Sequence, residues 1–301
     1  MESPIESLNA YLATQKNLLD KDYNLHENKE VPVDFNSKNI IIGNFYQQIL
    51  EVIFFRDFGV YSKDIHVIGN GSQGFVIKFN CTDINNGIIK LKTYTKRHYE
   101  SDRQLPNRIA VKVQLIDTDT SYYENRILRE EFLMNYLNIL PINTKTTQIN
   151  TAKKTVQDAI PQFYFGCTIQ FYNVFFRLSF MELIDNNEYK TLEKYIDETN
   201  DNGINQQICY NLKKLINSLW WLKITHNDLS VRNILVKIKQ NKLEDIKLID
   251  FGLSQPFDGA TSENEYKHIF QNPQSLKEQH GSNIKKLNEI CILLKCVDYS
   301  R

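Results

Sequence analysis

The chain has 301 residues, of which 42% are hydrophobic, 12% aromatic and 24% charged. This composition predicts a soluble globular protein, and the length allows one large domain or two lobes around a cleft. The 36 basic and 36 acidic residues cancel, so net charge does not indicate a nucleic-acid partner or an anionic membrane surface.

The five cysteines are scattered along the chain and form no C-x-x-C pair. We therefore expect neither a zinc site nor a disulfide framework, and the thiols are expected to be reduced. The N-terminus is polar and acidic, unlike a signal peptide, and no apolar run is long enough to span a bilayer. These features predict a cytoplasmic or nuclear protein with no membrane partner.

Residues 1–64 are expected to form a polar extension with one helix at 44–57, and we consider this extension a candidate surface for a partner protein. Strand signals follow. Residues 64–82 hold two β-branched and aromatic runs separated by glycines, which predicts a β-hairpin. Further strands are predicted over 108–116, 162–170 and 173–184.

Between these strands, residues 125–140 predict a helix. Its apolar face carries Ile127, Glu130, Leu133, Met134 and Leu137. After about residue 190 the pattern becomes helical, and apolar residues recur at helical spacing over 204–223. Two polar stretches, 83–107 and 143–155, are expected to be surface loops.

A glycine-rich pattern, G-x-G-x-x-G-x-V, lies within the predicted hairpin. Its members are Gly69, Gly71, Gly74 and Val76. Glycines let backbone N–H groups approach phosphate oxygens without interference from a Cβ atom. The pattern alone is weak, since any glycine-bearing hairpin can produce it. It is not a dinucleotide fingerprint, because a strand follows it instead of a helix.

Lys112 lies within the apolar strand at 108–116. Beside a phosphate-binding hairpin its ammonium group can pair with phosphates, but an edge-strand lysine facing solvent is the simpler alternative. Glu130 lies on the apolar face of the predicted helix, where a carboxylate needs a partner, and Lys112 is a natural one. Glu131 is the rival, although it is expected to lie off that apolar face.

The stretch HNDLSVRNILV, residues 226–236, follows the long apolar helix. An aspartate at this place, Asp228, can accept a hydroxyl proton, and Asn233 can ligate Mg²⁺. Asp250 ends an apolar strand beside a glycine turn, which makes it a second candidate metal ligand. An Asx-turn before a strand, or an aspartate that closes a strand, is the ordinary structural alternative.

Glycine loop, strand lysine, helix glutamate, H-x-D-L-x-x-x-N and D-F-G occur in this order in protein kinases. The spacings agree: 18 residues separate Lys112 from Glu130, 5 separate Asp228 from the asparagine and 17 separate that asparagine from Asp250. Over about residues 67–294 the chain resembles the eukaryotic-type protein kinase family. The resemblance implies an α+β, bilobal fold. Its N-lobe, residues 65–184, would be a small antiparallel β-sheet with one main helix, and its C-lobe, residues 185–301, mostly helical and shortened.

The resemblance also implies roles for residues. Asp228 would be the catalytic base, Asn233 and Asp250 would hold Mg²⁺, and Glu130 would hold Lys112 against the ATP phosphates. The ATP contacts would be Gly69, Gly71, Gly74, Val76, Ala110, Lys112, Met181 as gatekeeper, Glu182 and Ile184 at the hinge, and Leu235. Met134, His226 and Phe251 would form an apolar spine.

Five positions bear on the departures from the family pattern. Asn227 replaces the arginine that pairs with a phosphorylated activation loop, which predicts activity independent of loop phosphorylation. Ser230 replaces a lysine at the transferring phosphate, where Arg232 would supply a cation instead. Gln274 replaces a glutamate, and Asn283 replaces an aspartate, so their polar contacts lack charge assistance.

We therefore expect an ATP- and Mg²⁺-dependent protein kinase, Ser/Thr-directed, whose protein substrate the sequence does not identify. Three alternatives remain open. The LIDFGLS segment and the short C-lobe are similar to the kinase-like ATPase subunit of a tRNA-modifying complex. The substituted positions suggest an ATP-binding pseudokinase, and the HNDLS segment also occurs in small-molecule phosphotransferases.

Overall fold

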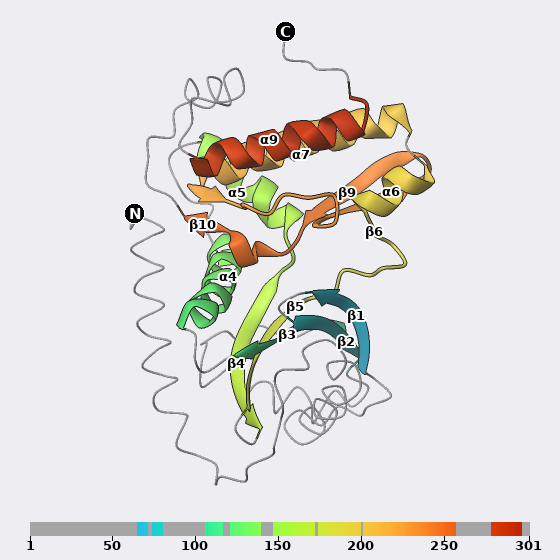
Figure 1. Ribbon diagram of the computed structural model, residues 1–301. Coiled ribbons are helices and arrows are strands. Elements are labelled where there is room, and N and C mark those ends of the chain that lie inside the picture. Colours follow the sequence, from blue (N-terminus) through green and yellow to red (C-terminus); the bar gives the residue numbers. More distant parts are fainter. Residues whose placement is uncertain are drawn as a thin grey trace. The chain divides into compact units, whose positions relative to one another are not determined.

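The computed structural model describes residues 65–71, 74–80, 106, 108–116, 121–139, 147–171, 174–199, 201–256 and 278–296 (Figure 1). These residues form two compact units. The sheet unit contains the strands from residue 65 to residue 182. The helical unit contains the described residues of Leu128–Gln162 and those from Ile184 onward. The expected extension at 1–64 and the expected loop at 83–107, apart from Pro106, lie outside the described residues.

The sheet unit is a five-stranded antiparallel sheet in the order β1-β2-β3-β5-β4. Its strands are β1 (Ile65–Gly71), β2 (Gly74–Asn80), β3 (Arg108–Ile116), β4 (Phe163–Phe171) and β5 (Val174–Glu182). The predicted hairpin and all three further strands are confirmed. Alternate residues of β3 point to opposite faces of the sheet, and residues on both faces are buried. The rings of Phe165 and Phe180 stack, with 4.2 Å between their centroids.

The helical unit combines helices with two small sheets. Its helices are the part of α4 (Ser121–Ile139) from Leu128 onward, α5 (Thr147–Ala159), α6 (Leu192–Glu198), α7 (Asn202–Trp221) and α9 (Glu278–Leu293). One sheet has the order β6-β8-β9, from β6 (Lys190–Thr191), β8 (Ile234–Lys239) and β9 (Lys242–Leu248). The other pairs β7 (Ile224–Thr225) with β10 (Gln255–Pro256).

The long helix α7 is the centre of the helical unit. Its start is capped by Asp201, whose carboxylate accepts from the amides of Gly203 and Ile204, which satisfies two of the donors left open at a helix start. One face of α7 is apolar and buried, and α9 lies alongside it (Figure 1). The predicted helices at 125–140 and 204–223 correspond to α4 and α7.

A buried polar chain ties α6 and α7 to the turn that follows α9. The hydroxyl of Tyr195 on α6 donates to Oδ1 of Asn205 on α7 at 3.0 Å, and Nδ2 of Asn205 donates to the backbone oxygen of Leu294 at 2.8 Å. Next to this contact, Cys209 and Cys296 form a disulfide. The expectation of reduced, unpaired thiols is wrong for this pair, because 87 residues of sequence separate cysteines that the fold brings together.

The second expected surface loop, 143–155, is also corrected by the structure. Residues from Thr147 form α5, which packs on α7 and β9. Ala152, Val156 and Ala159 are buried at helical spacing, and Lys153 is fully buried with them. The stretch resembles a loop in sequence because small and polar residues make up most of its buried face, so few large apolar side chains mark it as a helix.

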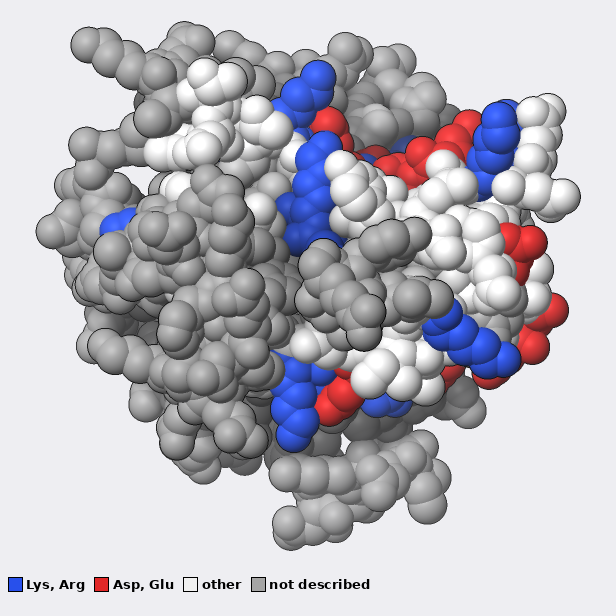
Figure 2. All heavy atoms as spheres, turned by 90° about the horizontal axis from the view of Figure 1, so that it is seen from above, with Lys and Arg blue, Asp and Glu red and all other residues white. Residues whose placement is uncertain are grey.

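The surface carries both signs of charge. On the face drawn in Figure 2, acidic and basic side chains of the described residues both occur, in keeping with equal numbers of the two in the chain. Among the described residues, no helix is long and apolar enough to cross a membrane.

Candidate functional site

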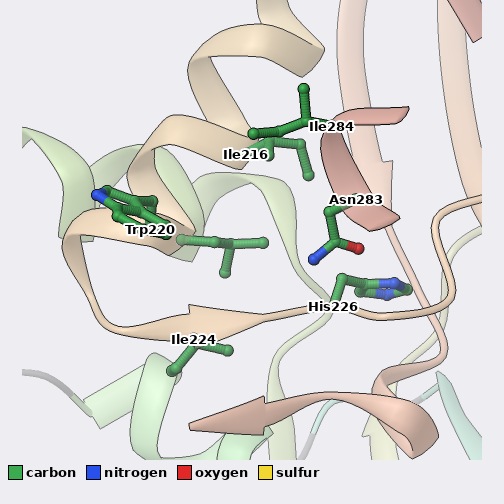
Figure 3. A pocket seen from close by; sticks show the side chains of 7 residues that line it. Ile216, Trp220, Ile224, His226, Asn283 and Ile284 are labelled. Carbon is green, nitrogen blue, oxygen red and sulfur yellow. The ribbon is translucent and has the colours of Figure 1, made fainter. Parts of the chain in front are cut away.

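The loop from His226 to Asn233 connects β7 to β8 in the helical unit. Its backbone turns sharply at Asn227, which has a φ of 59°. Asparagine is among the few non-glycine residues that adopt this left-handed conformation readily. The amide of Asn227 donates to Oδ1 of Asn283 on α9 at 3.0 Å. Figure 3 shows the Asn283 side chain reaching from α9 toward this loop. Asn283 therefore accepts a hydrogen bond from the loop backbone, and it does so with a neutral amide instead of a charged carboxylate.

Asp228 and Asn233 lie side by side in this loop. Nδ2 of Asn233 donates to the backbone oxygen of Asp228 at 2.9 Å and to its carboxylate Oδ2 at 3.0 Å. Since the amide nitrogen of Asn233 is used in this way, its Oδ1 points elsewhere and is the atom left for a cation. One oxygen of Asp228 is thereby oriented by a neutral donor, and the carboxylate keeps its acceptor character.

A backbone hydrogen bond holds the residue before Asp250 next to Asn233. The amide of Ile249 donates to the backbone oxygen of Asn233 at 2.9 Å. Asp250 then adopts φ 64° and ψ 73°, a left-handed conformation, before a 3₁₀ turn over Phe251–Leu253. Aspartate, like asparagine, is among the non-glycine residues that adopt this conformation more readily. The carboxylate of Asp250 and Oδ1 of Asn233 are hard oxygen donors, the kind that Mg²⁺ prefers, so these two residues suit a magnesium ion.

His226 is fully buried and packs edge-on against Phe251 at 4.8 Å between ring centroids. Burial lowers the pKa of His226 to about 4, although the carbonyl of Ile249 and the charge of Asp250 oppose that shift. The imidazole is therefore neutral at physiological pH. Its Nε2 lies 3.0 Å from the Ile249 oxygen, which assigns the proton to Nε2. Nδ1 is enclosed and has no hydrogen-bond partner among the described residues. We assign His226 a packing role. Met134, the third expected spine residue, is buried on α4.

A small cavity lies behind this loop (Figure 3). It is lined by Ile216, Leu219, Trp220, Ile224, His226, Asn283 and Ile284. About 20 Å³ of it is open to the centre of a water molecule, which is room for about one water. The cavity is too small for a nucleotide, and it is part of the packing between α7, α9 and the loop.

The segment after Asp250 is fastened to the same loop. Ser254 is fully buried, and its hydroxyl donates to the backbone oxygen of His226 at 3.0 Å. Nδ2 of Asn227 donates to the backbone oxygen of Leu253 at 3.3 Å. Sequence reasoning missed Ser254, and it treated Asn227 only as a lost arginine. The signal for both is weak, because small polar residues are common near turns.

The glycine pattern lies in the sheet unit, at the tip of the β1–β2 hairpin. Gly71 is opposite Gly74, and Gly69 is opposite Val76. Gly74 has a φ of 152°, and a Cβ atom there would lie 2.1 Å from the backbone oxygen of Val113. This glycine is thus required by the close approach of β3, whatever the hairpin binds.

Lys112 lies on β3 between two strands, opposite Val76 on one side and Ser179 on the other. β3 is an interior strand, so the alternative of an edge-strand lysine is wrong. Ala110 is buried on the same strand. Of the expected hinge residues, Met181 and Glu182 end β5, Ile184 belongs to the helical unit, and Leu235 lies on β8.

Glu130 is buried on α4, as expected, but Glu131 beside it is buried as well. The expectation that Glu131 lies off the buried face is therefore wrong, because α4 is enclosed over most of its circumference from Ile127 to Leu137. Glu130 belongs to the helical unit and Lys112 to the sheet unit.

The remaining expected residues lie on the loop or beyond the described ranges. Arg232 is exposed on the loop, and the backbone oxygen of Ser230 accepts from the amide of Asn233 at 3.1 Å. Gln274 lies outside the described residues.

Comparison with known proteins leaves the family open. The sequence matches no protein-family profile, and no curated protein matches it. A solved structure that resembles it is the crystal structure of the kinase domain of PF14_0431, with a TM-score of 0.46 and 17% sequence identity. That match covers 78% of this chain and 63% of the other, so this chain spans less than two thirds of the kinase-domain structure.

Proposed function

We propose that this protein is an ATP- and Mg²⁺-dependent protein kinase that transfers the γ-phosphate to serine or threonine hydroxyls. The observation that carries the proposal is the double hydrogen bond from Nδ2 of Asn233 to Asp228. It orients the carboxylate of Asp228 and leaves the side-chain oxygen of Asn233 available for a metal ion. Asp250 follows β9, the strand that pairs with β8 directly after the loop. An Asx-turn alone would not require this combination.

Each residue then has a chemical task. Asp228 accepts the proton of the attacking hydroxyl, and Asn233 and Asp250 are the ligands for Mg²⁺. Mg²⁺ and ATP, when bound, supply charge shielding and the phosphoryl group. Arg232, which is exposed on the loop, would offset charge on the transferring phosphate in place of a cation at Ser230.

Residues outside this loop have proposed roles in nucleotide binding. Lys112 would contact the ATP phosphates. The backbone of the glycine pattern would cover those phosphates. The hinge backbone at Glu182 and Ile184 would hydrogen-bond the adenine. Experiments are needed to identify the protein substrate.

The test is transfer of radiolabelled γ-phosphate to the protein itself and to generic protein substrates. We expect transfer by the wild type with Mg²⁺, and its loss in Asp228→Asn and in Asp250→Ala. Asp197→Asn, at a position on the helix α6, is the matched control and should keep wild-type activity. Equal activity of Asp228→Asn and wild type would overturn the proposal.

The same preparations distinguish the alternatives. ATP hydrolysis that is stimulated by tRNA or a partner protein, without protein phosphorylation, would identify a kinase-like ATPase subunit. A thermal shift with ATP and Mg²⁺ but no turnover would identify a pseudokinase. Phosphorylation of a small hydroxyl compound alone would identify a small-molecule phosphotransferase.

A further inference from the structure

We propose that Asn227 and Ser254 form a latch that positions Asp250 for Mg²⁺ without any phosphate on the chain. The latch consists of two side-chain hydrogen bonds, from Asn227 to the oxygen of Leu253 and from Ser254 to the oxygen of His226. This inference rests on the function proposed above, and it assigns to both residues a positioning role in that site.

These side-chain hydrogen bonds connect the two segments beyond the point where the backbone pairing of β7 and β10 ends. β7 and β10 pair in an antiparallel register in which Thr225 is opposite Gln255. Continued by two residues beyond the strands, this register would set His226 opposite Ser254 and Asn227 opposite Leu253. At each of these three steps a side chain of one segment donates to the backbone oxygen of the other. The first of them is the hydroxyl of Thr225, which lies 3.3 Å from the oxygen of Gln255.

The backbone at Asn227 aims its side chain at this partner. Its left-handed φ of 59° and the bond from its amide to Asn283 fix the direction of the Cα–Cβ bond. Oδ1 of Asn227 is enclosed and has no hydrogen-bond partner among the described residues. Asn227 therefore acts in the latch through its side-chain nitrogen, as a donor. A carboxylate at this position is disfavoured, because a buried charge without a partner is costly.

The latch reaches Asp250 through a short rigid turn. The amide of Ser254 donates to the backbone oxygen of Phe251 at 3.0 Å, which closes the 3₁₀ turn that begins directly after Asp250. On the other side, Ile249 is bonded to Asn233. Asp250 is therefore held from both sides in its left-handed conformation, and the latch supplies the C-terminal half of that support.

All groups of the latch are uncharged. The donors are an amide and a hydroxyl, and the acceptors are backbone oxygens. An arginine–phosphate ion pair forms only after a kinase has added the phosphate, and salt weakens it. The latch requires no phosphorylation and contains no ion pair, so it holds Asp250 in place from the time the chain folds.

The main test compares variants that remove the donor without straining the backbone. Asn227→Gly keeps access to positive φ, whereas Asn227→Asp keeps the shape and replaces the donor by an acceptor. Asn241→Gly is the matched control, because Asn241 has a φ of 55° in the exposed turn between β8 and β9. Ser254→Ala removes the second bond.

Loss of one hydrogen bond predicts about a fivefold rise in the Mg²⁺ concentration for half-maximal phosphate transfer in Asn227→Gly. A larger rise is expected in Asn227→Asp, and no change in Asn241→Gly. The double variant Asn227→Gly/Ser254→Ala should lose less than the product of the single effects, because both bonds hold one turn. Wild-type protein treated with a phosphatase should keep its activity.

Hydrogen–deuterium exchange over residues 250–256 separates the latch from the proposed function. Faster exchange there in Asn227→Gly, together with the raised Mg²⁺ requirement, supports the latch. Unchanged exchange, or faster exchange with an unchanged Mg²⁺ requirement, overturns it, and so does loss of activity on phosphatase treatment. If the wild type transfers no phosphate to protein under any Mg²⁺ concentration, it is the proposed function that fails.

Discussion

The side-chain nitrogen of Asn233 bonds both the backbone oxygen and the carboxylate of Asp228, five residues earlier in the same loop. One amide thus orients the proposed base with its nitrogen and presents the proposed metal ligand with its oxygen. The two tasks are inseparable in this geometry, since the nitrogen and the oxygen lie on opposite sides of one planar group. Asn233 is therefore the position where a nearly isosteric change should be most informative.

Asn233→Asp should lower phosphate transfer at neutral pH by tenfold or more. The change removes a donor to a charged group, which contributes about 1.5–3 kcal/mol, and it sets a second carboxylate against Asp228. Steady-state kinetics with varied Mg²⁺ would measure the loss. Asn211→Asp on α7, where Nδ2 bonds the backbone oxygen of Gln207, is the matched control and should leave activity unchanged.

Asn283→Ala should lower the free energy of unfolding of the helical unit by about 2 kcal/mol. It removes the acceptor for the part-buried backbone amide of Asn227 and leaves that donor unpaired. Urea unfolding followed by circular dichroism would measure the change. Asn288→Ala, on the same helix, is the control, and an equal loss in both variants would contradict the role given to Asn283.

Stability should fall as the pH is lowered from about 6.5 toward 4. Burial holds the pKa of His226 at about 4, below the ordinary histidine value of 6.5. Between these values the unfolded chain binds a proton that the folded protein does not, so the free energy of unfolding falls by about 1.4 kcal/mol per pH unit. Above the pKa of the histidine in the unfolded chain, the imidazole is neutral in both states, and His226 causes no further change in the free energy of unfolding.

The check for this effect is urea unfolding of wild type and His226→Phe between pH 4 and 7. The phenylalanine variant should show a shallower slope, because it keeps the aromatic packing and has nothing to protonate. His66→Gln, at an exposed position on β1, is the matched variant. Identical slopes in His226→Phe and wild type would show that another group causes the acid sensitivity.

Reduction of the Cys209–Cys296 disulfide should lower the free energy of unfolding by about 2–4 kcal/mol. The bond closes a long loop between α7 and the end of α9, so its main effect is to restrict the unfolded chain. Unfolding with and without a thiol reductant would measure the difference. Cys296→Ser should abolish the response to reductant, and Cys291→Ser, at a buried free cysteine, should retain it.

Much of the secondary structure follows from local sequence patterns. Alternating β-branched and aromatic residues predicted all five strands of the sheet unit, and helical spacing predicted α4 and α7. These patterns work because burial on one face repeats with the period of the strand or helix. The pattern fails for α5, whose buried face holds Lys153 and small residues in place of large apolar ones.

Within the candidate site, the sequence by itself determined the residue types and their spacing, as with the five residues from Asp228 to Asn233. That spacing closes one loop, so local geometry is enough to bring the pair together. Tertiary structure alone decided that Asn283 accepts from Asn227, that Asn227 reaches Leu253 and that Cys209 meets Cys296. These contacts join segments 26 or more residues apart, and a periodic pattern carries no information about which distant segment lies opposite. The packing of α7, α9 and the two short strands settles that choice.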